Sequence, residues 1–366
     1  MRPAIREVLR TLIEAGYEAY IVGGYVRDVL LGHDTNDCDI TTSATPDQVE
    51  RLFPEAQSHA KQYGTIGVVC LGELFEVTTF RSEGTYDDFR RPSSVTFSTS
   101  LEADLSRRDF TINALAMNLQ GELTDLYGGQ ADLESSLLRA IGDPLVRLRE
   151  DALRILRALR FQSQLGFQLE ASLVDAMKEC APLVAHLSSE RVMDELKKLL
   201  RGPFLGLALT QYHEIAIPGL PLLVADEGLS LVEQCAIAQL RDHFDASGFP
   251  WTKEERSIYL DAQTLTTSAP TKTQLYQMSH PQAMIRIGAV VYHWDAAKLT
   301  DMYHGLVIHS RSELKISGHD VVALQFEGES IEQVLRIVES MVVEEQLHNE
   351  QTAILSWIKE HYDENY

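Results

Sequence analysis

Two aspartates near the start of the chain have the spacing of a paired carboxylate site. Asp37 and Asp39 stand at positions i and i+2 of the segment NDCDI, and in a strand such residues project from the same face. Two carboxylates this close repel each other unless a cation lies between them. A solvated turn uses the same residue types, but Ile40 and Thr41 continue a β-type run directly afterwards. The spacing therefore favours a metal-binding pair.

A third acid, Glu76, interrupts the apolar segment LFEVTTF, where we expect a buried or half-buried carboxylate on a strand face. A buried acid needs a partner. Three carboxylates from two strands that share a pair of divalent cations form the arrangement required for two-metal nucleotidyl transfer. In this chemistry one cation activates the attacking hydroxyl, and the other holds the triphosphate and stabilises the leaving oxygen.

A glycine pair upstream of the acids is a candidate phosphate site. The segment EAYIVGG predicts a strand that runs into Gly23 and Gly24, and VRDVLLG predicts a helix closed by Gly32. Backbone N–H groups near a helix N-terminus suit a phosphate. A plain turn from strand to helix explains the same glycines, so this pair alone does not decide between the two.

The elements that must position these residues change character once along the chain. Up to about residue 145, short β-branched and apolar runs alternate with Gly, Pro and Asp turns, which predicts strands with occasional helices. From residue 149 onward, apolar residues recur at three-to-four spacing and predict helices. We therefore expect an α+β head and an all-helical remainder, with weak breaks near 201–204, 247–255 and 267–273.

Composition restricts the classes of partner and the location. The 366 residues are 45% apolar and 23% charged, as in soluble globular proteins, and no apolar run approaches membrane-spanning length. The N-terminal segment carries charges every few residues, so we expect no signal peptide and a cytoplasmic location. A formal charge of −22 opposes general attraction to polyanions, so a nucleic-acid site has to be a local basic stripe.

The cysteines indicate neither a disulfide framework nor a zinc site, because they lie far apart and form no CxxC pair. We expect buried thiols at Cys38, Cys70, Cys180 and Cys235.

Five motifs in order carry a family resemblance. They are GGYVRD with DCD, RRDFTINALA (107–116), DLYGGQADL (125–133), REDALRILRALRF (149–161) and SSERVMDELKKLL (188–200). Together they resemble the class II tRNA nucleotidyltransferases, the CCA-adding enzymes, a branch of the polymerase β-like superfamily that also contains bacterial poly(A) polymerases. The likeness spans about the first 200 residues and is fainter beyond, at 314–324 and 343–355.

The resemblance implies template-independent addition of C, C and A from CTP and ATP to the tRNA 3′ end, with release of pyrophosphate and a two-metal Mg²⁺ site. It implies a head with a mixed or antiparallel sheet (1–140), a base-recognition neck (141–202), a body (203–270) and a tRNA-binding tail (271–366), the last three all helical. It assigns catalysis to Asp37, Asp39 and Glu76, with the metal at Asp37 and Asp39. The nucleotide-binding residues it implies are Gly23, Gly24, Arg27, Arg108, Asp109, Asn113, Asp151, Arg154, Arg157 and Arg160.

The family's base-reading pair corresponds to Asp151 and Arg154, and the chemistry is coherent. Cytosine and adenine present an amine donor beside a ring-nitrogen acceptor, whereas uracil and guanine present a carbonyl beside an N–H. A carboxylate acceptor next to a guanidinium donor matches the first pattern and clashes with the second, and a bidentate pair discriminates by roughly 1–3 kcal/mol. On a helical wheel both residues lie opposite the apolar face, so a salt-bridged solvent face with Glu150 and Arg154 at i,i+4 is the alternative.

Two further segments have expected roles. Asp109 and Asn113, four apart at an expected helix start, offer acceptors and donors to a ribose, and by the resemblance this motif contacts the nucleotide sugar. An N-capping Asp109 is the alternative. Residues 84–99 read as a mobile loop, and their DDFRRP resembles the flexible loop with which complete CCA-adding enzymes switch to ATP.

Several alternatives stay open at this point. A bacterial poly(A) polymerase usually carries a GRRF-type signature before the third acid and a basic tail, and this chain has neither; an enzyme that adds only CC or only A remains. A nucleotidyltransferase acting on small molecules has no need for the helical half, and an RNA-binding module has no need for three acids. We read His319 and Asp320 as structural because no second His and Asp accompany them. Oligomeric state is undecided.

Overall fold

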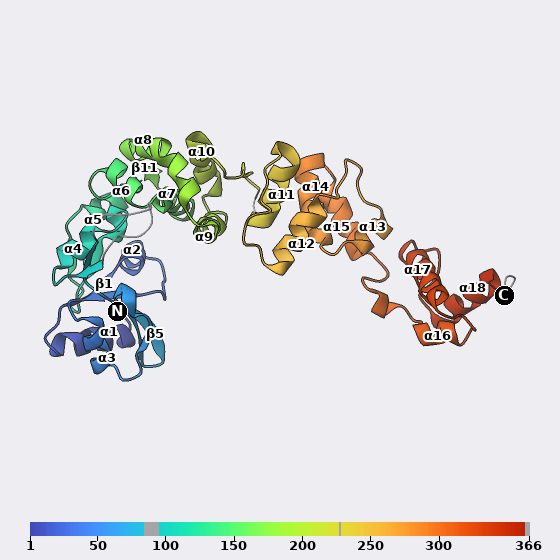
Figure 1. Cartoon of the computed structure of the whole chain (residues 1–366), viewed down its shortest axis with the longest axis horizontal. Coiled ribbons are helices and arrows are strands. Elements are labelled where there is room, and N and C mark those ends of the chain that lie inside the picture. The colour runs from blue at the N-terminus through green and yellow to red at the C-terminus, as the bar shows by residue number, and fades with distance from the viewer. Residues whose placement is uncertain (84–94, 227, 363–366) are drawn as a thin grey trace. The chain divides into compact units, whose positions relative to one another are not determined.

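The structure of the protein is a computed structural model, which describes residues 1–83, 95–226 and 228–362. The chain divides into two compact units, residues 1–220 with 224–228 and residues 221–223 with 229–366 (Figure 1). The expected loop at 84–99 lies largely outside the described residues, so its role in switching to ATP stays a prediction.

A seven-stranded sheet forms the N-terminal part of the first unit, with the strand order β3-β4-β5-β2-β1-β8-β9. Its strands are β1 (Ala19–Val22), β2 (Asp39–Thr42), β3 (Gln57–Ala60), β4 (Thr65–Cys70), β5 (Glu73–Thr79), β8 (Leu115–Met117) and β9 (Leu123–Asp125). Strands β2 and β5 are parallel, and the other neighbouring pairs of this sheet are antiparallel. The expectation of a mixed sheet in an α+β head is confirmed.

Two short strand pairs accompany the sheet. Strands β6 (Arg81–Glu83) and β7 (Val95–Phe97) are antiparallel, and strands β10 (Leu137–Leu138) and β11 (Gln168–Leu169) are parallel.

Helices and short 3-10 turns surround the sheet. They are α1 (Pro3–Glu14), α2 (Gly24–Leu30), α3 (Pro46–Leu52), η1 (Lys61–Tyr63), α4 (Leu101–Ser106), η2 (Thr111–Asn113) and α5 (Gly129–Glu134). Helix α1 is amphipathic: Ile5, Val8, Leu9 and Leu12 recur at three-to-four spacing and are fully buried where the helix packs against β1 and β4. This packing holds the sheet from one side.

The remainder of the first unit is mostly helical, with β11 as an exception to the all-helical segment that we expected. It contains α6 (Pro144–Glu150), α7 (Leu153–Leu165), α8 (Ala171–Cys180), η3 (Ala181–His186), α9 (Ser189–Leu199) and α10 (Leu205–Ile215). Helix α7 packs against both α9 and α10. Gly202, which follows α9, leaves no room for a side chain, because a Cβ there would lie 2.3 Å from the carbonyl oxygen of Ser163. The close approach fixes α9 beside α7, which matters for the site described below.

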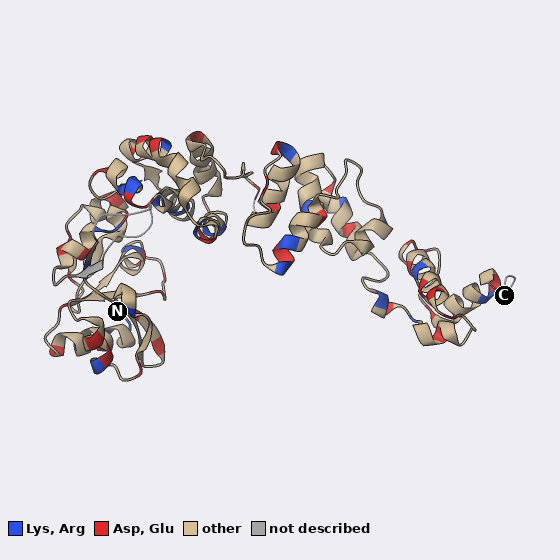
Figure 2. Cartoon of the chain, viewed as in Figure 1, with Lys and Arg blue, Asp and Glu red and all other residues tan. Residues whose placement is uncertain are grey.

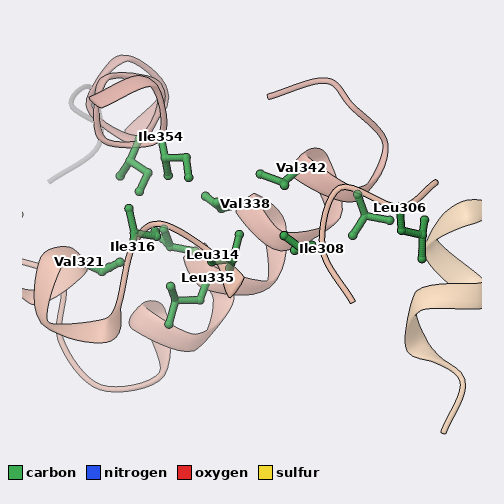
Figure 3. Packing of buried hydrophobic residues seen from close by; sticks show 12 residues of the cluster. Leu306, Ile308, Leu314, Ile316, Val321, Leu335, Val338, Val342 and Ile354 are labelled. Carbon is green, nitrogen blue, oxygen red and sulfur yellow. The ribbon is translucent and has the colours of Figure 1, made fainter. Parts of the chain in front are cut away.

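The second unit is entirely helical in the part that the structure describes. It contains α11 (Leu231–Asp242), α12 (Lys253–Ala262), α13 (Lys272–Gln277), α14 (Pro281–Tyr292), α15 (Ala296–His304), η4 (Arg311–Glu313), α16 (Gly318–Val322), α17 (Glu329–Val343) and α18 (Gln351–Tyr362). One apolar cluster joins α16, α17 and α18, and Figure 3 shows Val321, Val338 and Ile354 within it. The helices expected from the apolar spacing are therefore present.

Three smaller expectations can be compared with the structure. Asp320 accepts hydrogen bonds from the backbone N–H and the hydroxyl of Ser317, both at 2.7 Å, which is the capping role of a structural residue. All four cysteines are free thiols; Cys38, Cys180 and Cys235 are buried, whereas Cys70 is only half-buried. Within the described ranges, no helix has the length and apolar character needed to cross a membrane.

Candidate active site

A single pocket in the first unit gathers every residue that the sequence analysis proposed for chemistry. The pocket has a volume of about 690 Å³ and is lined by residues of the sheet, of the segment around η2, and of α7 and α9. The predicted site residues among them are Gly23, Gly24, Arg27, Asp37, Asp39, Glu76, Arg108, Asp109, Asn113, Asp151, Arg154, Arg157 and Arg160. Their proximity is thus a structural fact, and their individual roles stay predictions.

The parallel pairing of β2 and β5 places two of the acids side by side. Asp39 is the register partner of Glu76 in this ladder. Strand β5 alternates, so that Phe75 and Val77 are buried while Glu76 is exposed on the opposite face. Our expectation of a buried or half-buried Glu76 is therefore wrong, because that face of the strand borders the pocket and not the core.

The charges of these acids oppose one another. Burial in the concave wall raises the pKa of Asp39, although its side chain still reaches solvent; the charges of Asp37 and Glu76 raise this pKa further, and Arg108 lowers it. A divalent cation would relieve the repulsion, and carboxylate oxygens are the ligands that Mg²⁺ prefers. Among the described residues no three His, Cys, Asp or Glu side chains form a tight metal-binding group. The fit to a metal thus rests on the repulsion and on the donor type.

Gly23 allows the acids and a basic residue to approach the start of α2. Its φ of 71° lies in the left-handed region. A Cβ at this position would lie 3.1 Å from Nη1 of Arg108 and 3.7 Å from Oδ2 of Asp39. The backbone conformation therefore favours glycine here, and a Cβ would also press on the Arg108 guanidinium.

Arg108 is held by a buried acid that the sequence analysis missed. Asp104, on α4, is fully buried and forms ion pairs with Arg107 at 2.8 Å and with Arg108 at 3.2 Å. Burial lowers the pKa of Arg108, and the charge of Asp104 opposes this change. Asp104 thus keeps a guanidinium at the pocket wall beside Asp39.

Asp109 and Asn113 lie next to each other, but on a different backbone from the helix start that we expected. Helix α4 ends at Ser106, and Asp109 precedes the single 3-10 turn η2, so the expected α-helix start is wrong. The extended Phe110, with φ −125° and ψ 149°, interrupts any helix between the two residues. Asn113 nevertheless donates to Asp109 at 3.1 Å and accepts from Arg27 at 2.8 Å.

Asp109 also anchors the basic side of the pocket. Arg157 Nε donates to its Oδ2 at 2.7 Å, and Glu195 of α9 pairs with Arg160 at 3.1 Å. Burial alone would raise the pKa of Asp109, but the charge of Arg157 and the hydrogen bonds from Asn113, Arg157 and the Phe110 N–H lower it to about 2. The carboxylate is therefore ionised at any physiological pH.

This shift predicts a pH-dependent contribution to stability. The pKa of Asp109 is about 2 in the folded protein against an ordinary value of 3.8, so its stabilisation is fully present above that ordinary value and is lost as the pH falls towards 2. We expect Asp109→Asn to lower the free energy of unfolding at neutral pH by roughly 2 kcal/mol, and by less in acid. Urea unfolding of both proteins at neutral pH and at about pH 3 measures this. Equal losses at the two pH values would contradict it; Asp34→Asn, an exposed aspartate, is the control.

Phe161 organises three guanidinium groups. The guanidinium carbons of Arg27, Arg157 and Arg160 lie 5.1, 5.5 and 4.2 Å from the centre of its ring. Phe110 meets the same ring edge to face at 5.8 Å and steadies it. The ring face attracts cations and offsets part of their mutual repulsion. The three guanidinium groups are thus gathered at one wall of the pocket, each with an acidic partner: Asp28 for Arg27, Asp109 for Arg157 and Glu195 for Arg160.

The proposed base-reading pair spans a helix break. Helix α6 ends at Glu150, Asp151 is extended with φ −141° and ψ 103°, and α7 begins at Leu153. Our reading of this motif as one continuous helix is therefore wrong. The break is stabilised locally, because Oδ1 of Asp151 accepts the backbone N–H of Leu153 at 3.0 Å.

Arg154 is held more firmly than a surface residue would be. It is 6% exposed, and its Nη1 donates to Glu150 at 2.8 Å and to the Arg147 carbonyl at 2.9 Å. Its Nη2 donates to the Arg107 carbonyl at 3.1 Å. The i,i+4 pair with Glu150 thus exists, but within the pocket wall and not on a solvated face.

Helix α9 contributes two charged residues whose roles the sequence analysis did not recognise. Arg191 pairs with Asp151 at 2.8 Å, and the buried Glu195 pairs with Arg160. Their i,i+4 spacing on a helix with a buried apolar face was the only local signal. Their partners lie on α7 and at its start, out of reach of any local pattern.

Three family models match the chain. The Poly A polymerase head domain matches residues 19–139, and the tRNA nucleotidyltransferase domain 2 (putative) matches residues 264–358. Between them, residues 166–215 match the probable RNA and SrmB-binding site of polymerase A.

Whole-length relatives decide the family. A CCA-adding enzyme from a Geobacillus species is 36% identical over 385 residues, which cover 96% of this chain and 95% of that protein. The CCA-adding enzyme of Lacticaseibacillus paracasei is 38% identical over 374 residues, covering 95% and 94%. The chain belongs to the CCA-adding enzymes. It is a nucleotidyltransferase, and the poly(A) polymerase alternative is not favoured.

Solved CCA-adding enzymes have the same fold. The enzyme of Bacillus stearothermophilus, in complex with CTP, has a TM-score of 0.81 and 32% identity and covers 100% of this chain and 99% of its own. The Thermotoga maritima CCA-adding enzyme complexed with tRNA_CCA has a TM-score of 0.67 at 18% identity, which supports the fold alone. Nucleotidyltransferases of this family usually use divalent metal ions.

Proposed function

We propose that this CCA-adding enzyme builds the CCA end of tRNA in the cytoplasm, from CTP and ATP, with Mg²⁺ and without a nucleic-acid template. The observation that carries the proposal is one pocket that is lined both by the acids of β2 and β5 and by Asp151 and Arg154. A protein with 32% identity that was solved with CTP, and relatives named CCA-adding enzymes, support the choice of substrate.

In each step the 3′ hydroxyl oxygen of the tRNA attacks the α-phosphorus of the nucleoside triphosphate. The bond between this phosphorus and the oxygen that bridges to the β-phosphorus breaks, pyrophosphate leaves, and the hydroxyl proton is lost to solvent. Asp37, Asp39 and Glu76 would hold Mg²⁺ at this point. Bound Mg²⁺ supplies a lower pKa for the attacking hydroxyl and neutralises charge on the triphosphate.

The basic side of the pocket orients the incoming nucleotide. Arg27, Arg157 and Arg160, grouped around Phe161, and Arg108 beside Gly23 would bind the triphosphate. The backbone N–H groups of Gly23 and Gly24 would add donors, and the Asp109–Asn113 pair would contact the ribose. These contacts are common to CTP and ATP, so they bind both nucleotides without selecting between bases.

Base choice falls to Asp151 and Arg154. The carboxylate accepts the amine of cytosine or adenine, and the guanidinium donates to the ring nitrogen. We further propose that residues 1–140 carry the metal site, residues 141–202 read the base, and the helical segments 203–270 and 271–366 bind the tRNA acceptor arm. Protein side chains thus replace a template.

The direct test combines purified protein, Mg²⁺, and a tRNA that lacks its last three nucleotides. With labelled CTP alone we expect two additions, and with CTP and ATP three. Long runs of A from ATP would indicate a poly(A) polymerase, and a stop after CC would indicate a partial enzyme.

A salt titration tests the RNA interface separately. Despite the formal charge of −22, we expect tRNA affinity to fall by at least about a hundredfold between low and physiological salt, because a local basic stripe meets the phosphates and releases counterions. Figure 2 shows Lys and Arg interspersed with Asp and Glu in both units, so such a stripe has to be local. Filter binding at several salt concentrations measures the slope, and a flat titration would point to a different substrate.

A further inference from the structure

Arg191 of α9 fixes the carboxylate that we propose reads the base. Its Nη2 donates to Oδ2 of Asp151 at 2.8 Å, while the backbone N–H of Leu153 donates to Oδ1 at 3.0 Å. Both oxygens therefore have a fixed donor, and the plane of the carboxylate is set. A carboxylate oxygen accepts two hydrogen bonds, so each retains a lone pair for a ligand.

Arg191 has more hydrogen-bond donors than its contact with Asp151 uses. Its side chain is 28% exposed and lines the same pocket. Its Nη1 is buried without a hydrogen-bond partner, and Asp151 is its acidic partner within the described part of the chain. A guanidinium carries five donors and no acceptor. Asp151 and the guanidinium donors of Arg191 thus lie in contact in the wall of one pocket.

We propose that Arg191 is a specificity-determining residue that works with Asp151 as a pair. Arg191 holds the carboxylate in the orientation that accepts the amine of cytosine or adenine. Asp151 in turn covers guanidinium donors that suit the opposite bases, because uracil and guanine present a carbonyl oxygen where cytosine and adenine present the amine. The inference rests on the proposed function, since it deepens base choice at the same site.

The pair makes an unusual prediction for the loss of Asp151. If the carboxylate were the whole selecting device, Asp151→Ala would only weaken the binding of cytosine and adenine. Because Arg191 contacts this carboxylate, the same substitution replaces an acceptor by donors, so kcat/KM for UTP and GTP should rise. Combining Asp151→Ala with Arg191→Met should abolish this rise in kcat/KM for UTP and GTP. The double variant therefore separates the pair from the lone carboxylate.

The experiment compares wild-type enzyme with Asp151→Ala, Arg191→Met and the double variant. Each is given CTP, ATP, UTP or GTP as the only nucleotide, and kcat and KM are measured on tRNA ending one step before the base concerned. We expect Asp151→Ala to raise the UTP-to-CTP and GTP-to-ATP ratios of kcat/KM at least about tenfold, and the double variant to lose most of that rise. Arg191→Met alone should raise KM for CTP and ATP more than it lowers kcat.

Two controls separate positioning from folding. Arg191→Lys retains one donor to Asp151 and should recover part of the lost affinity. Arg149→Met removes an arginine from a surface pair with Glu179, in which both side chains are more than half exposed, and should behave as wild type. If Arg191→Met fails to fold, Arg191→Gln, whose neutral amide lacks the fixed donors of a guanidinium, carries the comparison alone and combined with Asp151→Ala.

The outcomes distinguish this inference from the proposed function. Equal UTP-to-CTP ratios in Asp151→Ala and in the double variant would overturn the role of Arg191, even in an enzyme that adds CCA normally. A wild-type enzyme that adds only A would overturn the proposed function; the GTP-to-ATP ratios of the same variants would then still decide the role of Arg191, because adenine presents the same amine.

Discussion

Replacement of Asp37 or Asp39 by alanine is expected to slow the addition of both C and A by at least about a thousandfold, since several kcal/mol of transition-state stabilisation depend on the ions that these acids hold. Affinity for tRNA should change little, because we propose that these acids bind metal and not RNA. Single-turnover addition with labelled CTP, together with filter binding of tRNA, measures the two quantities independently.

The segment between α2 and β2, which contains Asp37, supplies a matched control for this prediction. Asp34 is exposed just upstream and is not part of the pocket lining, so Asp34→Ala should retain wild-type activity. Glu76→Ala should resemble the two active-site variants, because Glu76 is the register partner of Asp39. Near-normal addition by the Asp37 or the Asp39 variant would rule out a metal site at these residues.

The second large effect is expected at Arg154. Arg154→Ala removes a charged donor from the base-reading position, and such hydrogen bonds contribute about 1.5–3 kcal/mol, so kcat/KM for CTP and ATP should fall by roughly ten- to a hundredfold. Discrimination against UTP and GTP should weaken at the same time, because their ring N–H would no longer meet a donor. Incorporation of each of the four nucleotides measures both effects.

Stability has to be followed in parallel, because Arg154 is buried and donates to two backbone carbonyls as well as to Glu150. Glu150 keeps Arg147 as a partner at 2.8 Å, which limits the loss. Melting temperatures of Arg154→Ala and of the surface variant Arg149→Met show how much of the effect is structural. A folded Arg154→Ala enzyme that excludes UTP and GTP as strictly as wild type would place base choice elsewhere.

The fold was largely predictable, because its elements carry strong periodic signals. Helix α17 repeats Val334, Leu335, Val338 and Val342 on its buried face, and strand β5 alternates around Phe75 and Val77. The metal-binding hypothesis came from the two-residue period of a strand, but β2 begins only at Asp39, so Asp37 precedes the strand in which we expected it. Local rules sufficed wherever the relevant neighbours lie within one element.

The errors arise where a backbone breaks without changing the apolar pattern. Leu148 and Ala152 continue the buried face on either side of Asp151, so the interruption of the helix there leaves no trace in the hydrophobic spacing. At Glu76 the error was to treat an apolar neighbourhood in sequence as a buried one in space. The opposite face of the same strand borders an open pocket.

The residues that were missed act across long distances in the sequence. Arg191 meets Asp151 and Glu195 meets Arg160 only because α9 packs against α7, and Phe161 gathers an arginine from α2. Asp104 is a further example, since nothing in the segment LEADLS marks it as buried. No local spacing encodes these contacts, which need the tertiary structure.

The pairing of β2 with β5 also determines how the enzyme would lose activity on partial unfolding. Asp39 and Glu76 share one rung of a backbone ladder, and a slip of one residue in either strand would turn its acid towards the core. A half-formed site is therefore not an available state of this sheet. In partial denaturant the population should consist of molecules with full activity and molecules with none. Activity should disappear together with the hydrogen-exchange protection of the Ile40 and Val77 amides, with no range of weakened enzymes between.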